Sequence, residues 1–133
     1  MKKIKRRLML AKDDYDIIMS YVKKRPASVT FNRRDTQELE GELKRAKVVD
    51  KKDLPGDVVR LNSTVTIKEE KENKIMELMV VIPEKADIRQ KKISVMSPVG
   101  TALIGFGKGH QVKWRVPAGN KTFTITEVQN LYA

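Results

Sequence analysis

The first hydrophobic pattern along the chain has the period of an α-helix. Apolar side chains recur every three or four residues at Ala11, Tyr15, Ile18 and Val22, which is typical of a helix with one apolar face. Asp13 and Asp14 lie at the start of the expected helix, and Lys23, Lys24 and Arg25 lie at its end, an order that complements the helix dipole. We expect this helix to begin near residue 13 and to end before Pro26, which cannot continue it.

A second, shorter helical pattern follows. Asp35 or Thr36 can cap its N-terminus, and Leu39 and Leu43 lie four residues apart on one face. Two helices of ~12 residues, each roughly 18 Å long at ~1.5 Å per residue, would pack as an antiparallel hairpin. We therefore assign residues 1–54 to a short helical hairpin, a stub of coiled coil.

Beyond residue 54 the pattern changes from helical to alternating. Stretches rich in Val, Ile and Thr alternate apolar with polar side chains, as half-buried strands do. Five strands are predicted: Ser63–Glu70, Lys74–Pro83, Lys92–Ser97, His110–Pro117 and Lys121–Gln129. Turn-forming residues at 53–57, 69–73 and 118–120 separate the elements. With one short helix, this predicts an α+β domain over residues 55–133, with a mostly antiparallel sheet.

The stretch ISVMSPVGTALIGFGKGHQVKW, residues 93–114, raises the question of a phosphate-binding loop, because it holds three glycines two residues apart. Ser97 is a good N-cap and Pro98 a good first helical residue. The short helix should therefore run to Ile104, with Gly105 as a left-handed C-cap. Phosphate-binding loops precede a helix, where N–H groups and the positive dipole end face the anion. Here the glycines follow the helix, so we interpret them as a cap and a turn.

Composition restricts the chemistry more than it identifies a partner. The net charge of +11 favours an acidic partner, either a nucleic acid or an acidic protein surface. A solvated surface that keeps a small protein soluble accounts for the charge equally well. There is no cysteine and only one histidine, so the sequence offers no disulfide, thiolate metal site or histidine cluster. We expect no metal and no cofactor.

The sequence also bears on location. The basic start at residues 1–7 is followed by only four apolar residues before Lys12, too few for the core of a signal peptide. No apolar run in the sequence is long enough to span a bilayer. We expect a cytoplasmic protein with no membrane partner.

Three stretches of the chain resemble the C-terminal domain of the bacterial Gre-type transcript cleavage factors: STVTIKEE, IPEKADIRQKKISVMSPVGTALIGFGKGHQV and PAGNKTFTITEV. The stretch ELEGELKRAKVVDKKDLPGDVV extends the resemblance to about residues 38–130. It implies an FKBP-like fold that docks on RNA polymerase at the rim of the secondary channel. The chain is most similar to the short-armed branch of this family, the regulators of nucleoside diphosphate kinase (Rnk), which bind polymerase without rescuing arrested complexes.

In the long-armed members of this family, two acidic residues at the coiled-coil tip help to hold a catalytic magnesium ion. Here the connection between the predicted helices is basic, and Asp35 is its only carboxylate. The resemblance therefore implies no cleavage stimulation and no enzymatic activity. The basic residues form a candidate contact surface for nucleic acid or polymerase: Lys23, Lys24, Arg25, Arg33 and Arg34. They can equally be solvated helix ends that complement the dipole.

The resemblance places the polymerase contact at a strand-to-helix corner formed by Ser94, Met96, Ser97 and Pro98. Met96 stands where Asn or Asp is common in the long-armed factors. Fold geometry alone, a helix cap after a buried strand, also explains the corner. We expect Trp114 in the sheet core and His110 as an exposed turn residue.

The leading hypothesis is a monomeric regulator of core RNA polymerase. Its C-terminal domain would anchor at the channel rim, and the helical stub would exclude the longer cleavage factors. A second hypothesis is a basic protein that binds DNA or RNA through its N-terminal half. A third is a prolyl isomerase-like enzyme, since the FKBP-like fold also houses such enzymes. A fold by itself confers no activity, and 5% aromatic residues is few for an aromatic-lined pocket.

Overall fold

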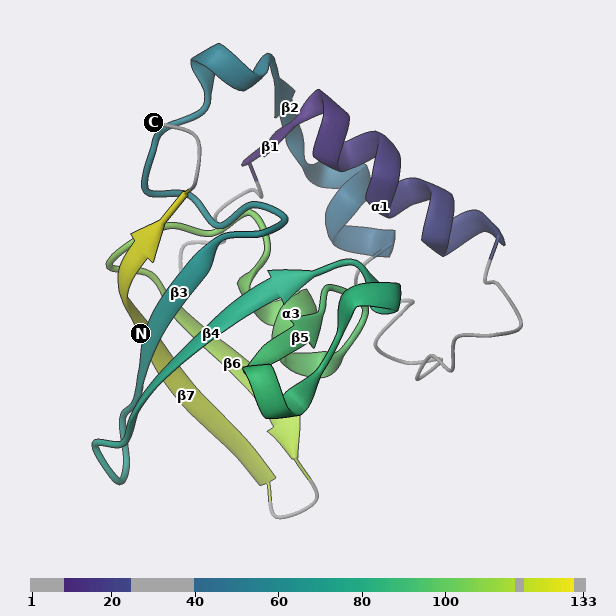
Figure 1. Ribbon diagram of the computed structural model, residues 1–133. Coiled ribbons are helices and arrows are strands. Elements are labelled where there is room, and N and C mark those ends of the chain that lie inside the picture. Colours follow the sequence, from purple (N-terminus) through teal and green to yellow (C-terminus); the bar gives the residue numbers. More distant parts are fainter. Residues whose placement is uncertain (1–8, 25–39, 117–118, 131–133) are drawn as a thin grey trace.

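The computed structural model describes residues 9–24, 40–116 and 119–130 of the chain (Figure 1). Its centre is a five-stranded sheet with the order β5-β4-β3-β7-β6. The strands are β3 (Thr64–Glu69), β4 (Ile75–Val81), β5 (Lys92–Ser94), β6 (Gln111–Val116) and β7 (Gly119–Gln129). All five predicted strands are present, and the fold is α+β as predicted. Strand β7 already includes residues 119 and 120 of the predicted last turn.

The sheet is antiparallel except at one edge. Strand β3 pairs antiparallel with β4 and with β7, and β6 pairs antiparallel with β7. Strand β5 instead runs parallel to β4. The chain between them turns through two 3₁₀ helices, η2 (Pro83–Lys85) and η3 (Ile88–Gln90). The expectation of a mostly antiparallel sheet is confirmed, and the one parallel pair arises because this connection returns β5 in the direction of β4.

The predicted turn at residues 69–73 closes the β3–β4 hairpin. Asn73 adopts a left-handed φ of 58°. The carboxylate of Glu69 accepts hydrogen bonds from the backbone N–H of Glu72 at 2.6 Å and of Lys71 at 3.0 Å. These bonds, with the charges of Lys121 and Lys71, lower the pKa of Glu69 below its ordinary value, although burial opposes them. The ionised carboxylate of Glu69 thus stabilises the turn by accepting hydrogen bonds from its backbone.

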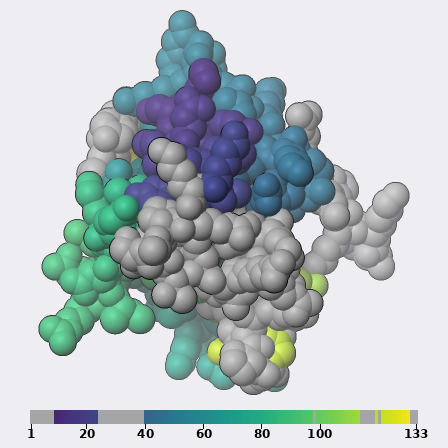
Figure 2. Space-filling view, turned by 90° about the vertical axis from the view of Figure 1, so that its right-hand side faces the viewer, coloured from purple at the N-terminus to yellow at the C-terminus, as the bar shows by residue number. Residues whose placement is uncertain are grey.

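The N-terminal part of the chain contains helix α1 (Lys12–Lys24), close to the predicted span. Residues 40–45 are also helical, and Figure 2 shows α1 in purple beside these residues in blue. The start of the predicted second helix and the connection before it, within residues 25–39, lie outside the described residues. We call residues 9–24 and 40–49 the arm, and residues 54–116 with 119–130 the globular domain.

The sequence pattern did not predict a small sheet in the arm. Strand β1 (Met9–Ala11) pairs in parallel with β2 (Lys47–Val49), with Leu10 opposite Val48. A 3₁₀ helix, η1 (Lys51–Asp53), then leads toward the globular domain. Three-residue strands are too short to show a period, so only the meeting of two distant segments reveals this pair.

Arm and globular domain share one apolar core. Alternate residues of the sheet, such as Ile67 and Phe123, form its centre together with Leu103 of helix α3 (Pro98–Leu103). The arm contributes four buried side chains to the same cluster: Leu10, Ile18, Val22 and Leu43. The apolar face predicted for the first helix is therefore the face that packs against the globular domain.

Candidate functional site

The predicted polymerase-contact corner joins β5 to α3. The hydroxyl of Ser97 donates to the carbonyl of Ser94 at 2.7 Å, and the N–H of Gly100 donates to Ser97 Oγ at 3.1 Å. Ser94 Oγ accepts from the N–H of Met96 at 2.9 Å. Ser97 is thus the N-cap of α3, as its sequence position predicts. These bonds hold the corner in one backbone conformation.

The four corner residues differ in what they present to solvent. The side chain of Met96 is buried, with 2% exposed, and belongs to the apolar core. Ser94 and Ser97 are half-buried, while the side chain of Pro98 lies outside the described part. Met96 therefore supports the corner through the apolar core. The polymerase contact of the corner remains a prediction.

The glycine-containing loop follows α3, as the sequence predicts. Gly105 adopts a left-handed φ of 84° directly after the helix, the conformation expected of a C-cap. Its N–H donates to the carbonyl of Val59 at 3.0 Å, and the N–H of Gly109 donates to the carbonyl of Ile125 at 2.7 Å. These amides hold the loop against neighbouring strands and segments.

His110 differs from its prediction. Its Nδ1 accepts a hydrogen bond from the N–H of Gly107 at 3.0 Å, and its ring meets that of Phe106 edge-on with centroids 5.8 Å apart. The residue is half-buried, so the expectation of an exposed turn residue is wrong. The loop closes around the imidazole because that ring supplies an acceptor for a loop amide. The backbone of Trp114 lies in β6, and its side chain is outside the described part.

The candidate basic surface is described only in part. Lys23 is exposed near the end of α1. The side chain of Lys24 and all of Arg25, Arg33 and Arg34 lie outside the described residues. Contact between this surface and nucleic acid or polymerase remains a prediction.

Helix α1 meets the globular domain at a buried ion pair. Nε of Arg60 donates to Oδ2 of Asp14 at 2.9 Å, and Nη2 of Arg60 lies 3.3 Å from Oδ1 of Asp13. The side chains of Arg60 and Asp14 are 8% and 7% exposed, whereas that of Asp13 is 58% exposed. Because the planar guanidinium has donors at fixed angles, the Arg60–Asp14 pair restricts the relative orientation of its two partners in addition to attracting them.

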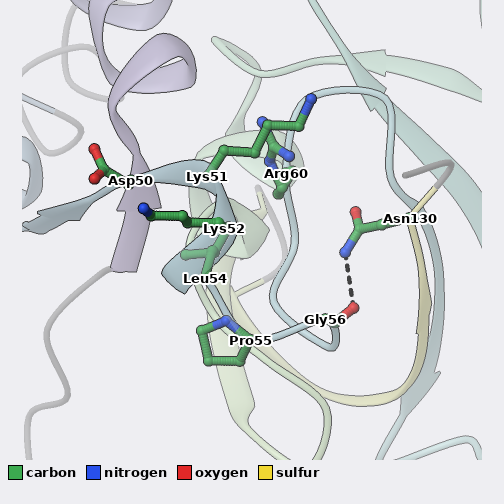
Figure 3. A pocket seen from close by; sticks show the side chains of 8 residues that line it. All are labelled: Asp50, Lys51, Lys52, Leu54, Pro55, Gly56, Arg60 and Asn130. Carbon is green, nitrogen blue, oxygen red and sulfur yellow. Dashed lines mark hydrogen bonds between the residues drawn. The ribbon is translucent and has the colours of Figure 1, made fainter. Parts of the chain in front are cut away.

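A second set of hydrogen bonds fixes Arg60 within the globular domain. Its backbone N–H donates to Oγ of Ser63 at 2.6 Å, and the hydroxyl of Ser63 donates to Oδ1 of Asn130. Nδ2 of Asn130 donates to the carbonyls of Gly56 at 2.8 Å and Val58 at 3.1 Å. The first of these two bonds is the dashed line in Figure 3. The network therefore joins the end of β7, the segment before β3 and the first turn of α1.

A hollow of about 610 Å³ opens beside this network (Figure 3). It is lined by Asp50, Lys51, Lys52, Leu54, Pro55, Gly56, Arg60 and Asn130. The three basic side chains of this lining are balanced by Asp50 and by the two aspartates that contact Arg60. Its volume suits a small ligand, but the balance of charge does not mark it as an anion site. Among the described residues, no group of three or more His, Cys, Asp or Glu side chains is placed to hold a metal ion.

The sequence pattern does not indicate this junction. Asp13 and Asp14 fit the dipole at the start of α1, and Ser63 fits the start of a strand. The available signal was Arg60, a charge inside the apolar run Val58 to Leu61. A charge in such a run is expected to find a buried partner, although its spacing does not reveal which carboxylate provides it.

No helix in the described part of the chain has the length and apolar character needed to cross a membrane.

Comparisons with known proteins agree with the fold. A family model described as "Transcription elongation factor, GreA/GreB, C-term" matches residues 54–130. Transcription elongation factor GreA of Trichlorobacter lovleyi is 43% identical over 93 residues, covering 70% of this chain and 59% of the relative. GreA of Azorhizobium caulinodans is 37% identical over 100 residues, covering 75% of this chain and 64% of the relative. The chain thus spans about three fifths of the length of these curated relatives.

A solved structure matches almost the whole chain. The prokaryotic transcription elongation factor GreA/GreB from Nitrosomonas europaea superposes with a TM-score of 0.77 at 32% sequence identity. The match covers 95% of this chain and 100% of that one. The family match over the globular domain and this agreement of fold lead to one conclusion: the chain belongs to the Gre family of transcription elongation factors.

Proposed function

We propose that this protein is a regulator that binds core RNA polymerase at the rim of the secondary channel. There it competes with transcript cleavage factors without stimulating cleavage itself. It acts in the cytoplasm as a monomer and as a non-enzymatic factor without a cofactor, in the manner of the short-armed Rnk branch. The observation that carries this proposal is the match of the globular domain to the C-terminal domain of Gre factors.

Two features of the chain support the finer parts of the proposal. The β5–α3 corner is a rigid, hydrogen-bonded edge with half-buried Ser94 and Ser97, suited to docking without rearrangement. The connection between the arm helices is basic, with Asp35 as its one carboxylate. The resemblance to the long-armed factors implies two acidic tip residues that help to hold a magnesium ion through oxygen ligands, and a connection with one carboxylate supports a factor that does not stimulate cleavage.

The test is binding of the purified protein to core RNA polymerase, measured by fluorescence anisotropy with and without excess long-armed cleavage factor. Saturable binding that the factor displaces, together with no cleavage of arrested complexes, is the expected result. A lack of binding at moderate salt would overturn the proposal. Cleavage of arrested complexes by the protein would overturn its second half.

Two charge reversals locate the contact. Lys92→Glu changes the strand that leads into the corner, whereas Lys121→Glu makes the same change at the start of β7. Rim charges chiefly alter the association rate, so Lys92→Glu should slow association and Lys121→Glu should not. Equal effects of both reversals would argue against docking through the corner.

A basic nucleic-acid-binding protein is the second candidate, on the observation of the +11 net charge. It predicts DNA or RNA binding that weakens steeply with salt. The polymerase proposal instead predicts a complex with core enzyme in the absence of DNA.

A further inference from the structure

We propose that Arg60 and Asp14 are positioning residues that set the direction in which helix α1 leaves the globular domain. This inference rests on the proposed function, because it gives the arm's direction a role in excluding longer factors from the channel. Neither residue needs to touch polymerase for this. Both act by orienting the helix whose exposed surface meets the channel.

The apolar contact between arm and globular domain does not fix a direction by itself. Leu10, Ile18, Val22 and Leu43 are buried in the common core. Apolar burial is non-directional, so a helix held only by such contacts can shift along the surface that covers it. A directional contact is needed to select one orientation.

The Arg60–Asp14 pair supplies that directional contact. Asp14 lies in the first turn of α1 and Arg60 lies before β3, and Nε and Oδ2 are 2.9 Å apart. Asp13, the neighbouring residue of the same turn, lies 3.3 Å from Nη2. Two carboxylates from one helical turn therefore contact two nitrogens of one planar group, which restricts rotation of the helix about the contact.

Burial makes this pair costly to break. The two side chains are 8% and 7% exposed, so most of the surface of each contacts protein rather than water. If one partner loses its charge, the other is left buried and uncompensated. The contact between α1 and the globular domain at Arg60, which we call the joint, then opens to relieve this cost. Helix α1 is no longer held in one orientation.

Other hydrogen bonds also join the described residues of the arm to the globular domain. Tyr21 donates to Glu84 from the half-buried side of α1, and the N–H of Met9 donates to the carbonyl of Gly105 at 3.1 Å. Arg60 is in addition held to the residue that follows β7, through Ser63 and Asn130. Arg60 therefore fixes the direction of α1 relative to the sheet.

The first experiment measures the direction of α1 without polymerase. The chain contains no cysteine, so Lys23→Cys on α1 and Lys113→Cys on β6 can carry a specific pair of spin labels. The test variant is Asp14→Asn. The matched control is Asp16→Asn, which makes the same charge change on the same helix at an exposed pair with Lys12. We expect one narrow distance distribution in the parent and control, and a broad or shifted one in Asp14→Asn.

The second experiment uses the same substitutions without labels. Displacement of a long-armed cleavage factor from core polymerase should weaken at least about fivefold in Asp14→Asn, the lower end of typical coupling between sites. Asp16→Asn should match the parent. Arg60→Lys, which keeps the charge but loses the planar fork, should behave as Asp14→Asn, and it serves as the test variant if Asp14→Asn does not fold.

The outcomes separate the two proposals. An unchanged, narrow distance distribution in both test variants overturns the proposal that Arg60 and Asp14 orient α1, whatever the result with polymerase. A broadened distribution with unchanged displacement also overturns the inference, because the direction of α1 would then have no role in competition. If the parent itself fails to bind polymerase, the proposed function fails, while the distance measurement still decides whether Arg60 and Asp14 orient the helix.

Discussion

The phenol of Tyr21 lies where helix α1 meets the 3₁₀ helix η2 of the globular domain. Its hydroxyl donates to Oε1 of Glu84. Burial first, then this hydrogen bond and the negative charge of Glu84, raise the pKa of Tyr21 from 10.0 to about 12. Ionisation would place a second negative charge beside Glu84 and remove the donated proton. A single side chain therefore reports whether the arm is docked.

The pKa of Tyr21 predicts how this contact responds to alkali. Because the folded pKa lies above the unfolded value of 10.0, the contribution of Tyr21 to stability is complete below pH 10 and is lost as the pH rises through about 12. We expect a late component near pH 12 in the ultraviolet titration of tyrosinate, and its loss in Tyr21→Phe. Titration of every tyrosine with one midpoint near 10 would contradict this.

At the scale of elements, helix α3 lies directly against the backbone of strand β5. Gly100 makes this approach possible, because a Cβ built on it would lie 2.1 Å from the carbonyl oxygen of Ser94 and 2.8 Å from Cα of Val95. Backbone atoms of a paired strand cannot move aside as a flexible side chain can. The shape of the corner proposed for polymerase docking therefore depends on the absence of a side chain at Gly100.

Gly100→Ala is expected to lower the free energy of unfolding by about 1–3 kcal/mol, as overpacking of a tight contact does. This loss should occur even though alanine favours helix over glycine by about 1 kcal/mol. Gly41→Ala is the matched control, since a Cβ at that helical position has no atom within 4 Å. Urea unfolding should show destabilisation at Gly100 and none at Gly41. Equal effects at both sites would mean that helix propensity alone decides.

At the scale of the whole molecule, the arm and the sheet are parts of one core. Leu43, with 1% exposed, lies in the same cluster as Ile67 and Phe123 of the sheet. A cluster that crosses from one segment to another couples their stabilities, because neither segment can leave without exposing the other's apolar surface. The arm is therefore expected to unfold with the globular domain.

Leu43→Ala tests this coupling. Truncation of a buried leucine should reduce the free energy of unfolding by about 2–5 kcal/mol. It should shift one transition that circular dichroism and fluorescence of the sole tryptophan report alike. Val48→Ala, at an arm position that is 40% exposed, should change stability much less. Two separate transitions in the parent protein would show that the arm is an independent unit.

Elements with a clear local signal were predictable from the sequence. The alternation of Val65, Ile67 and their neighbours predicted the strands, because side chains on a strand face one side at every second residue. Ser97 before Pro98 predicted the start of α3, since a cap hydroxyl and a fixed φ act within one helical turn. The resemblance to Gre factors also came from contiguous stretches, and the comparisons confirm the family.

Contacts between distant segments could not be predicted in the same way. The parallel course of β5 depends on the path of residues 82–91, and the pairing of β1 with β2 depends on where two short segments meet. The partner of Arg60, Asp14, lies 46 residues away in the sequence. No periodic pattern of side chains relates two residues at that separation. The half-burial of His110 likewise depends on Phe106 and Gly107 closing around it.

The sequence by itself determined the five strands of the central sheet, the helices α1 and α3 with the cap of α3, the excess of positive charge and the family. These follow from side-chain period, backbone preference and composition, which act over a few residues or over the whole chain at once. Only the tertiary structure decided that Asp14 meets Arg60, that Gly100 lies against Ser94, and that the arm shares the core of the sheet. These contacts depend on three-dimensional packing, which side-chain period and backbone preference within one element do not specify.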